Sequence, residues 1–372
     1  MLPKKGPMKM HKRMTWLRPL SRSEKRSVVN DLRLAILKHL ATVSMASGID
    51  KELVTDSLTQ KPIWLDCDTG HDDAFAILLA SYSPGVKLLG ISTVYGNAPL
   101  TNTTYNTRAV LEAVGRTDVP VYAGASRPKS REPCHAPDIH GDSGLDGTTC
   151  LPEPTVPARS DLSAVDAMYR ALSEEPAGTV WLVATGALTN VAELFAVYPS
   201  LADHIAGLSI MGGAVGDGFT KAPMGKRQGE TGSFGNHTPF AEFNIYCDPE
   251  AADAIFSNEV LAKKTTLIPL DLTHQFLATN QVQLGLLFGF GREMRNEPTM
   301  KDVSTVRRLF FEILTFFART YAEVFDLTDG PPTHDPLAVA AAFRPSLFYC
   351  NVDGNPGDQQ TERFKVEVVT EG

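Results

Sequence analysis

From about residue 60 onward, short β-branched runs alternate with helical runs, and this alternation constrains the fold more than any other feature. Strands are predicted at residues 63–65, 87–94, 119–122, 179–184 and 208–211, and helices at 74–80, 102–114, 163–172 and 190–197. Such alternation is typical of a parallel sheet covered by helices on both faces. We therefore expect a single large α/β domain with a mostly parallel central sheet flanked by helices. Ligands of such sheets bind beyond the strands, so the active site is expected at their carboxyl ends.

The charge of the chain is unevenly distributed. Over 372 residues the formal net charge is −8, and this acidic balance argues against a nucleic-acid partner. Residues 1–50 nevertheless contain 11 Lys or Arg against 3 acids. We interpret residues 1–60 as a basic extension that is disordered, serves as a targeting peptide, or precedes the true start. The expected location is cytoplasmic, with a mitochondrial leader as the alternative. No apolar run reaches 18 residues, so no membrane partner is expected.

The cysteines are odd in number, widely spaced and free of any C-x-x-C pattern. They are Cys67, Cys134, Cys150, Cys247 and Cys350. This usage predicts unbridged thiols in a reducing compartment. A nucleophilic cysteine needs a nearby base, and the sequence indicates none.

The strongest chemical signal is the segment 66–73, DCDTGHDD, which follows the first predicted strand. Four carboxylates within eight residues repel one another, and a cation or dedicated hydrogen bonds must compensate in a folded site. Ligands that are all oxygen suit Ca²⁺ or Mg²⁺ rather than zinc, although the spacing is not that of an EF-hand. The alternative is a solvated turn in which Asp72 and Asp73 start a helix.

Other polar residues follow later strands. Three predicted strands end at polar or glycine-rich turns, which contain Asn97, Thr185 and Met211, and two glycines follow Met211. Each residue alone is a weak signal, because ordinary turns and helix caps use the same residue types. Residues 242–244, EFN, would place Glu242 and Asn244 on one face of a strand.

Two further helical features stand near the end of the chain. His334 and Asp335 precede Pro336, which makes Asp335 a natural helix N-cap and His334 a candidate general acid. Apolar residues between 303 and 324 recur every three or four positions, which predicts a long amphipathic core helix.

Six motifs occur in order between residues 61 and 343: DCDTGHDDAFAILLA, VYGN, ATGALTN, MGG, NHTPFAEFN and HDPLA. Together they resemble the calcium-dependent nucleoside hydrolases, also described as inosine–uridine preferring. The resemblance implies a nucleoside hydrolase domain over 61–372 that cleaves the N-glycosidic bond of ribonucleosides into ribose and free base. It also implies Ca²⁺ as cofactor, a small ribonucleoside as partner, and a homodimer or homotetramer.

Carried over residue by residue, the resemblance implies a metal site and two catalytic residues. Asp68, Asp73 and Asp335 would bind Ca²⁺ together with the backbone carbonyl of Thr185. Asp68 would act as general base toward the attacking water, and His334 would protonate the leaving base. Asp66 would support the site without touching the ligands.

The remaining matches imply contacts to the nucleoside. Most would hold a ribose hydroxyl or pack against the sugar: Asp72 and Asn244 at the 2′ position, Asn97 and Asp335 at the 3′ side, Asn236 and Glu242 at the 5′ position, and Met211 and Phe243 against the ring. His140 would border the base pocket. Uridine is slightly favoured, with cytidine, inosine or a broad range left open.

The chain departs from the family pattern in two places. Residues 219–235 form an insertion that would be a mobile lid or would displace Asn236. The segment 363–372 stops where relatives continue, so we expect a C-terminal truncation that removes an edge strand and costs stability. Two alternatives remain: a ribonucleoside-binding protein that lost turnover, and a haloacid-dehalogenase-type phosphatase, whose threonine spacing Thr69 does not match.

Overall fold

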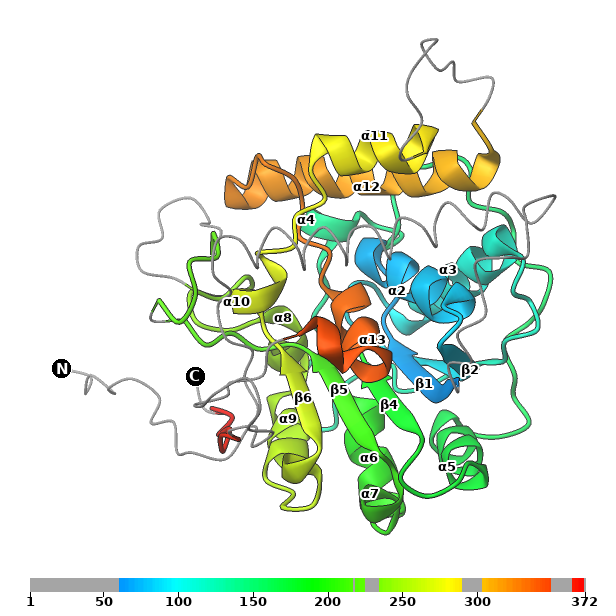
Figure 1. The fold of residues 1–372 in the computed structure, drawn as a ribbon, viewed down its shortest axis with the longest axis vertical. Coiled ribbons are helices and arrows are strands. Elements are labelled where there is room, and N and C mark those ends of the chain that lie inside the picture. The colour runs from blue at the N-terminus through cyan, green and yellow to red at the C-terminus, as the bar shows by residue number, and fades with distance from the viewer. Residues whose placement is uncertain (1–59, 217, 225–233, 290–302, 349–362, 371–372) are drawn as a thin grey trace.

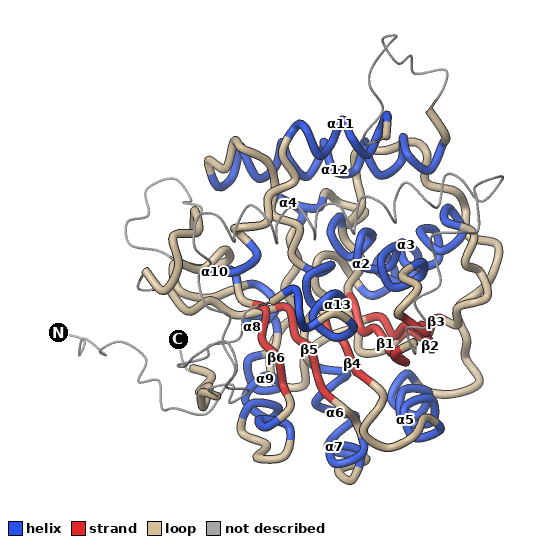
Figure 2. The backbone as a smooth tube through the Cα atoms, viewed as in Figure 1, coloured by secondary structure: helices blue, strands red, loops and turns tan. Residues whose placement is uncertain are grey.

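A computed structural model describes residues 60–216, 218–224, 234–289, 303–348 and 363–370. Its centre is one six-stranded sheet in which all neighbours pair in parallel, in the order β3-β2-β1-β4-β5-β6 (Figures 1 and 2). The strands are β1 Lys61–Cys67, β2 Val86–Thr93, β3 Val121–Ala123, β4 Trp181–Ala184, β5 Gly207–Met211 and β6 Thr265–Ile268. The predicted parallel α/β sheet is confirmed, with β6 as a strand that the sequence pattern did not indicate.

Helices cover both faces of this sheet. Their bounds are α2 His71–Tyr82, α3 Leu100–Val114, α4 Pro137–His140, α5 Ala164–Glu174, α6 Thr189–Val197, α7 Leu201–His204, α8 Phe243–Cys247, α9 Pro249–Phe256, α10 Leu270–Thr273, α11 Asn280–Phe288, α12 Thr305–Phe325 and α13 Asp335–Phe343, with short 3₁₀ turns at Leu261–Lys263 and Pro345–Leu347. One apolar core joins β1 to α2, α12 and α13, and a second core on the other face joins the sheet to α5, α6 and α9.

Strand β1 shows why the sequence folds this way. Ile63 and Leu65 enter the first core, whereas Trp64 between them enters the second. Because both faces are covered, the strand is apolar at successive positions instead of alternating with polar residues. Gly90 on β2 leaves room for the indole, since a Cβ at this position would lie 2.6 Å from the Trp64 ring.

The strand order reverses between β1 and β4. The chain runs outward through β2 and β3 on one side and through β4, β5 and β6 on the other. In sheets of this kind, the ligand crevice opens beyond the carboxyl ends at the reversal. The backbone N–H of Thr185 donates to the carbonyl of Asp66 at 2.8 Å, so the ends of β1 and β4 remain joined at that point.

Outside the sheet, the long amphipathic helix is confirmed as α12, which begins after Ser304. The strand interpretation of residues 242–244 is wrong: Glu242 caps α8, and its carboxylate accepts hydrogen bonds from two backbone N–H groups of that helix. Within the described ranges, no helix combines the length and apolarity needed to cross a membrane. The basic extension at 1–59 and residues 225–233 of the insertion lie outside the described residues.

Candidate active site

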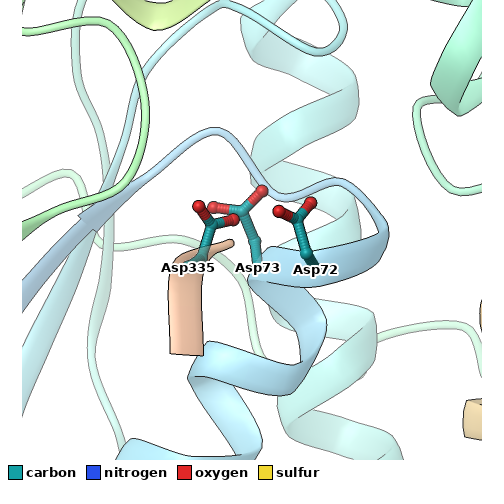
Figure 3. Close-up of side chains that lie close together, drawn as sticks. All are labelled: Asp72, Asp73 and Asp335. Atoms are coloured by element: carbon teal, nitrogen blue, oxygen red, sulfur yellow. The ribbon is translucent and has the colours of Figure 1, made fainter. Parts of the chain in front are cut away.

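Three carboxylates meet where α2 and α13 begin. Asp72 and Asp73 occupy the first turn of α2, and Asp335 is the first residue of α13. One oxygen from each lies within 4.8 Å of the others, and the three side chains point toward one another (Figure 3). Asp68 lies beside them after β1, and we call these four residues the carboxylate floor.

Hydrogen bonds fix two members of the floor. Asp68 Oδ2 accepts from the backbone N–H of Asn97 at 2.7 Å, while its buried Oδ1 has no hydrogen-bond partner. Asp73 accepts from the Gly70 N–H at 2.9 Å, from Asn97 Nδ2 at 3.1 Å and from the Thr185 hydroxyl at 2.8 Å. The ends of β1, β2 and β4 therefore converge on one acidic centre.

The carboxylate floor is electrostatically strained. Burial, followed by the charge of Asp73, raises the pKa of Asp72 to about 7. Burial also raises the pKa of Asp73, and it holds those of Asp68 and Asp335 well above their usual range with the help of neighbouring carboxylates. No lysine or arginine lines the cavity among the described residues. A cation would relieve this repulsion, so the floor fits a metal ion bound through oxygen.

Asp66 lies beneath the floor and supports it. Its Oδ1 accepts hydrogen bonds from the Ser92 hydroxyl and, at 2.8 Å, from Asn190 Nδ2. Burial raises the pKa of Asp66 to about 7. These hydrogen bonds link β1 to β2 and α6, and Asp66 Oδ2, like Asp68 Oδ1, is buried without a hydrogen-bond partner.

A cavity of about 490 Å³, including its open mouth, lies above the floor. Its lining includes eleven of the thirteen residues implied by the resemblance: Asp72, Asn97, His140, Thr185, Met211, Asn236, Glu242, Phe243, Asn244, His334 and Asp335. The other two, Asp68 and Asp73, are fully buried beneath the lining.

The segment around α8 shapes one side of the cavity. Glu242 accepts from the N–H groups of Gly213 and Ile245, at 2.9 and 3.0 Å. Asn244 Nδ2 donates to the Thr185 carbonyl at 2.9 Å and to the Met211 carbonyl at 3.3 Å. Asn244 therefore touches the same carbonyl that the resemblance implies as a metal ligand.

Asn236 lies on this side as well. Its Oδ1 accepts from the Phe243 N–H at 2.8 Å. The insertion before it therefore does not remove Asn236 from the cavity, whose lining includes this residue.

Three residues form what we call the histidine wall: His140, His334 and Tyr321. His334 Nε2 lies 2.8 Å from the Tyr321 hydroxyl, and its Nδ1 lies 2.7 Å from the Thr273 hydroxyl. Burial holds the pKa values of His334 and His140 well below their usual range. The two hydroxyl contacts hold the His334 ring in place at the cavity wall.

Sequence reasoning missed Tyr321, which lines the cavity, and His71, which is buried behind the lining residue His140. Tyr321 belongs to the apolar stripe of α12, and nothing in that periodicity separates a cavity residue from a core residue. His71 stands inside the acidic motif, and its ring stacks on Phe317 with centroids 5.3 Å apart. Its Nδ1 lies 3.2 Å from His140 Nδ1, and its Nε2 is 2.9 Å from the carbonyl of Asp146.

Comparison with known proteins agrees with this geometry. The family model described as "Inosine-uridine preferring nucleoside hydrolase" matches residues 63–372. The uridine nucleosidase of Saccharomyces cerevisiae is 43% identical over 286 residues, covering 76% of each chain. A pyrimidine-specific ribonucleoside hydrolase, RihA, of Escherichia coli is 39% identical over 289 residues, covering 77% of this chain and 81% of the relative.

A solved structure extends the similarity to the fold. The purine-preferring ribonucleoside hydrolase from Gardnerella vaginalis has a TM-score of 0.62 and 28% identity, covering 77% of this chain and 81% of that one. Since the family model spans most of the chain and the curated relatives exceed one-third identity, the chain belongs to the inosine–uridine preferring nucleoside hydrolase family.

Proposed function

We propose that this chain hydrolyses the N-glycosidic bond of pyrimidine ribonucleosides, uridine above all, to ribose and free base. The observation that carries the proposal is the 43% identity to a uridine nucleosidase over 286 residues. A relative described as pyrimidine-specific is also more similar in sequence than the purine-preferring structure, at 39% against 28% identity. The cavity above the carboxylate floor supports it, because its lining holds most of the residues that the resemblance implies for the nucleoside.

The proposed cofactor is Ca²⁺, held by Asp68, Asp73, Asp335 and the Thr185 carbonyl. Two observations support a hard cation: Asp68 Oδ1 is buried without a partner, and burial together with neighbouring carboxylates raises the pKa values of Asp68 and Asp335. Ca²⁺ accepts six to eight oxygen ligands in flexible geometry, which suits a set that combines carboxylates and a carbonyl. When bound, such a cation positions the attacking water and lowers its pKa.

In the proposed reaction, the residues of the floor serve the sugar. Asp68 takes the proton of the attacking water at its unpartnered Oδ1. As the glycosidic bond breaks, positive charge develops on the ribose, and the surrounding carboxylates stabilise it. Asp72 and Asn244 hold the 2′-hydroxyl, where these contacts strengthen as charge builds.

The other contacts follow the lining of the cavity. They would fix the remaining sugar hydroxyls and the ring: Asn97 and Asp335 at the 3′ side, Asn236 and Glu242 at the 5′ hydroxyl, and Met211 and Phe243 against the ring.

The histidine wall serves the leaving base. His334 is proposed as the leaving-group acid, and the Tyr321 hydroxyl, 2.8 Å from its Nε2, holds the imidazole ring at the cavity wall. His140 borders the base. Because the departing base gathers negative charge, proton donation on this side lowers the barrier.

A substrate panel tests the proposal. Purified chain with Ca²⁺ is assayed for reducing sugar released from uridine, cytidine and inosine. The expected result is turnover of uridine, with kcat/KM at least about tenfold above that of inosine, an energy difference of about 1.4 kcal/mol in the transition state. Turnover of inosine alone would contradict the base preference.

The same experiment separates the alternatives. Saturable uridine binding measured by calorimetry, with no reducing sugar released, would favour the binding protein that lost turnover. The phosphatase alternative loses its support because the family match spans residues 63–372, and hydrolysis of an aryl phosphate would be needed to restore it.

We also propose a cytoplasmic homodimer or homotetramer in which residues 1–60 are not needed for chemistry. Sedimentation equilibrium of the full chain tests the assembly, with a monomer as the contradicting result. Removal of residues 1–60 should leave uridine turnover unchanged. Import of a fluorescent fusion into mitochondria would instead favour the targeting interpretation of that segment.

A further inference from the structure

Two thiols meet behind the side of the cavity that Ala136 and Phe243 line. Cys134 is half-buried in the segment before α4, and Cys247 is the buried last residue of α8. The two thiols interact, and each shifts the pKa of the other. Both pack in one apolar cluster with the cavity residues Ala136 and Phe243. The contact therefore bridges two segments that line the cavity.

A base stands beside this pair. The Nε2 atom of His237 lies 3.6 Å from Cys134 Sγ. The His237 ring is held in place by Tyr246, with ring centroids 4.3 Å apart, and by Phe243 at 5.4 Å. The sequence indicated no base near any cysteine, because His237 is more than a hundred positions from Cys134. The structure corrects that expectation.

The two thiols differ in reactivity. The hydrogen bond from Cys247, followed by the contact with His237, lowers the pKa of Cys134 to about 5. Burial instead holds the pKa of Cys247 well above its usual range. In thiol–disulfide exchange the thiolate is the attacking species, so Cys134 is the nucleophile. Cys247 is then the resolving cysteine, which attacks the mixed disulfide formed on Cys134.

We propose that Cys134 and Cys247 form a reversible disulfide by exchange with a small-molecule disulfide of the glutathione type, joining the segment before α4 to α8. First, Cys134 Sγ attacks one sulfur of the oxidised reagent, whose S–S bond breaks and releases one reduced thiol. Cys247 then attacks Cys134 Sγ and displaces the second reduced thiol. Two cysteines are oxidised, one disulfide reagent is reduced, and the two cysteine protons end on the two released thiols.

The other described cysteines lack this arrangement. Cys67 is fully buried, and its Sγ contacts the Thr69 hydroxyl at 3.4 Å. Cys150 is half-buried, with its backbone N–H bonded to Thr148. Within the described part of the chain neither lies beside a second thiol, so both are expected to stay reduced under conditions that oxidise Cys134.

The test uses the full-length protein and oxidised glutathione, followed by proteolysis without reductant and mass spectrometry. The expected product is a peptide pair linked through Cys134 and Cys247, lost on treatment with dithiothreitol. In Cys247→Ser, glutathione should remain attached to Cys134, because the resolving thiol is gone. Cys150→Ser is the matched control and should form the same linked pair as the unmodified chain.

Two further outcomes decide the proposal. In the Cys247→Ser background, the added His237→Asn change should slow the attachment of glutathione to Cys134 severalfold. After denaturation, glutathione should attach to Cys134 at the same rate with and without His237→Asn. The proposal is overturned if glutathione remains on Cys134 in the unmodified chain, or if Cys150 reacts first. Since every readout is a mass or a rate of thiol modification, the result does not depend on nucleoside turnover.

Discussion

The carboxylate floor and the histidine wall face the same cavity but are assembled in different ways. The floor comes from strand ends and first helical turns, and three of its four acids lie within six residues of sequence. The wall instead combines side chains from α4, α12 and the residue preceding α13. The floor is thus encoded locally, whereas the wall exists only after distant helices have packed. Stabilisation of the reacting sugar should depend on the carboxylate floor, and protonation of the leaving base should depend on the histidine wall.

Removal of the cation should cause the largest loss, because it affects the whole floor at once. Exhaustive dialysis against a chelator is expected to lower uridine turnover by about 10³-fold or more, since a bound cation supplies several kcal/mol to the transition state. Re-addition of Ca²⁺ should restore turnover and raise Tm, because a ligand that binds only the folded state stabilises it. Full activity in chelator would contradict the proposed cofactor.

Asp68→Asn should cause the second largest loss of activity. The amide keeps the size of the side chain but cannot accept a proton, so kcat should fall by about 10²- to 10⁴-fold, the range typical of general bases. Steady-state kinetics on uridine measure the loss, and circular dichroism checks the fold. Asp329→Asn, at an exposed position, is the control and should be silent. A change in KM alone would argue for binding rather than catalysis by Asp68.

His334→Ala sharpens the division between floor and wall. Turnover of uridine should fall by about 10²-fold or more, the loss expected of a general acid. A nitrophenyl riboside, whose leaving group needs no proton, should lose less than about tenfold. His204→Asn, on α7 and outside the cavity lining, provides the matched control. Equal losses on both substrates would remove His334 from the role of leaving-group acid.

Gly70→Ala tests the contact between the carboxylate floor and the histidine wall. A Cβ at this position would lie 2.5 Å from His140 Nδ1 and 2.7 Å from Asn97 Nδ2, so both must move. Overpacking of this kind costs about 1–3 kcal/mol, which corresponds to about 5- to 160-fold in kcat/KM if the transition state bears it all. Gly85→Ala is the control, because its Cβ would meet its nearest atom at 3.3 Å, on Phe343. Unchanged kinetics would show that the two sides are independent.

Tyr321→Phe should have the smallest effect. It removes the hydroxyl that contacts His334 but keeps the ring against Phe317, whose centroid is 4.7 Å away. About a tenfold loss in kcat on uridine is expected, near 1.4 kcal/mol. Tyr105→Phe, at a position that is 40% exposed, should be silent. If Tyr321→Phe matched His334→Ala in size, protonation of the leaving base would depend on the phenol as much as on the imidazole.

The sequence was informative where local pattern decides structure. The motif at 66–73 predicted an acidic centre because its strand and helix are consecutive in the chain, and α12 was predicted because one apolar face recurs over many turns. Strand β6 was not recognised because four apolar or β-branched residues do not distinguish strand from loop. Tyr321 was read as core because its contact to the cavity depends on where α12 docks.

The parallel order of the sheet has a practical consequence for work with this protein. All strands direct their carboxyl ends toward the cavity, so the turns at the opposite end, lowest in Figure 1, are remote from the chemistry. Gly178, in the turn before β4, is surrounded by open space, since an added Cβ would meet no atom within 4 Å. A tether inserted in that turn would anchor the enzyme to a solid support and leave the opening of the cavity facing the solution.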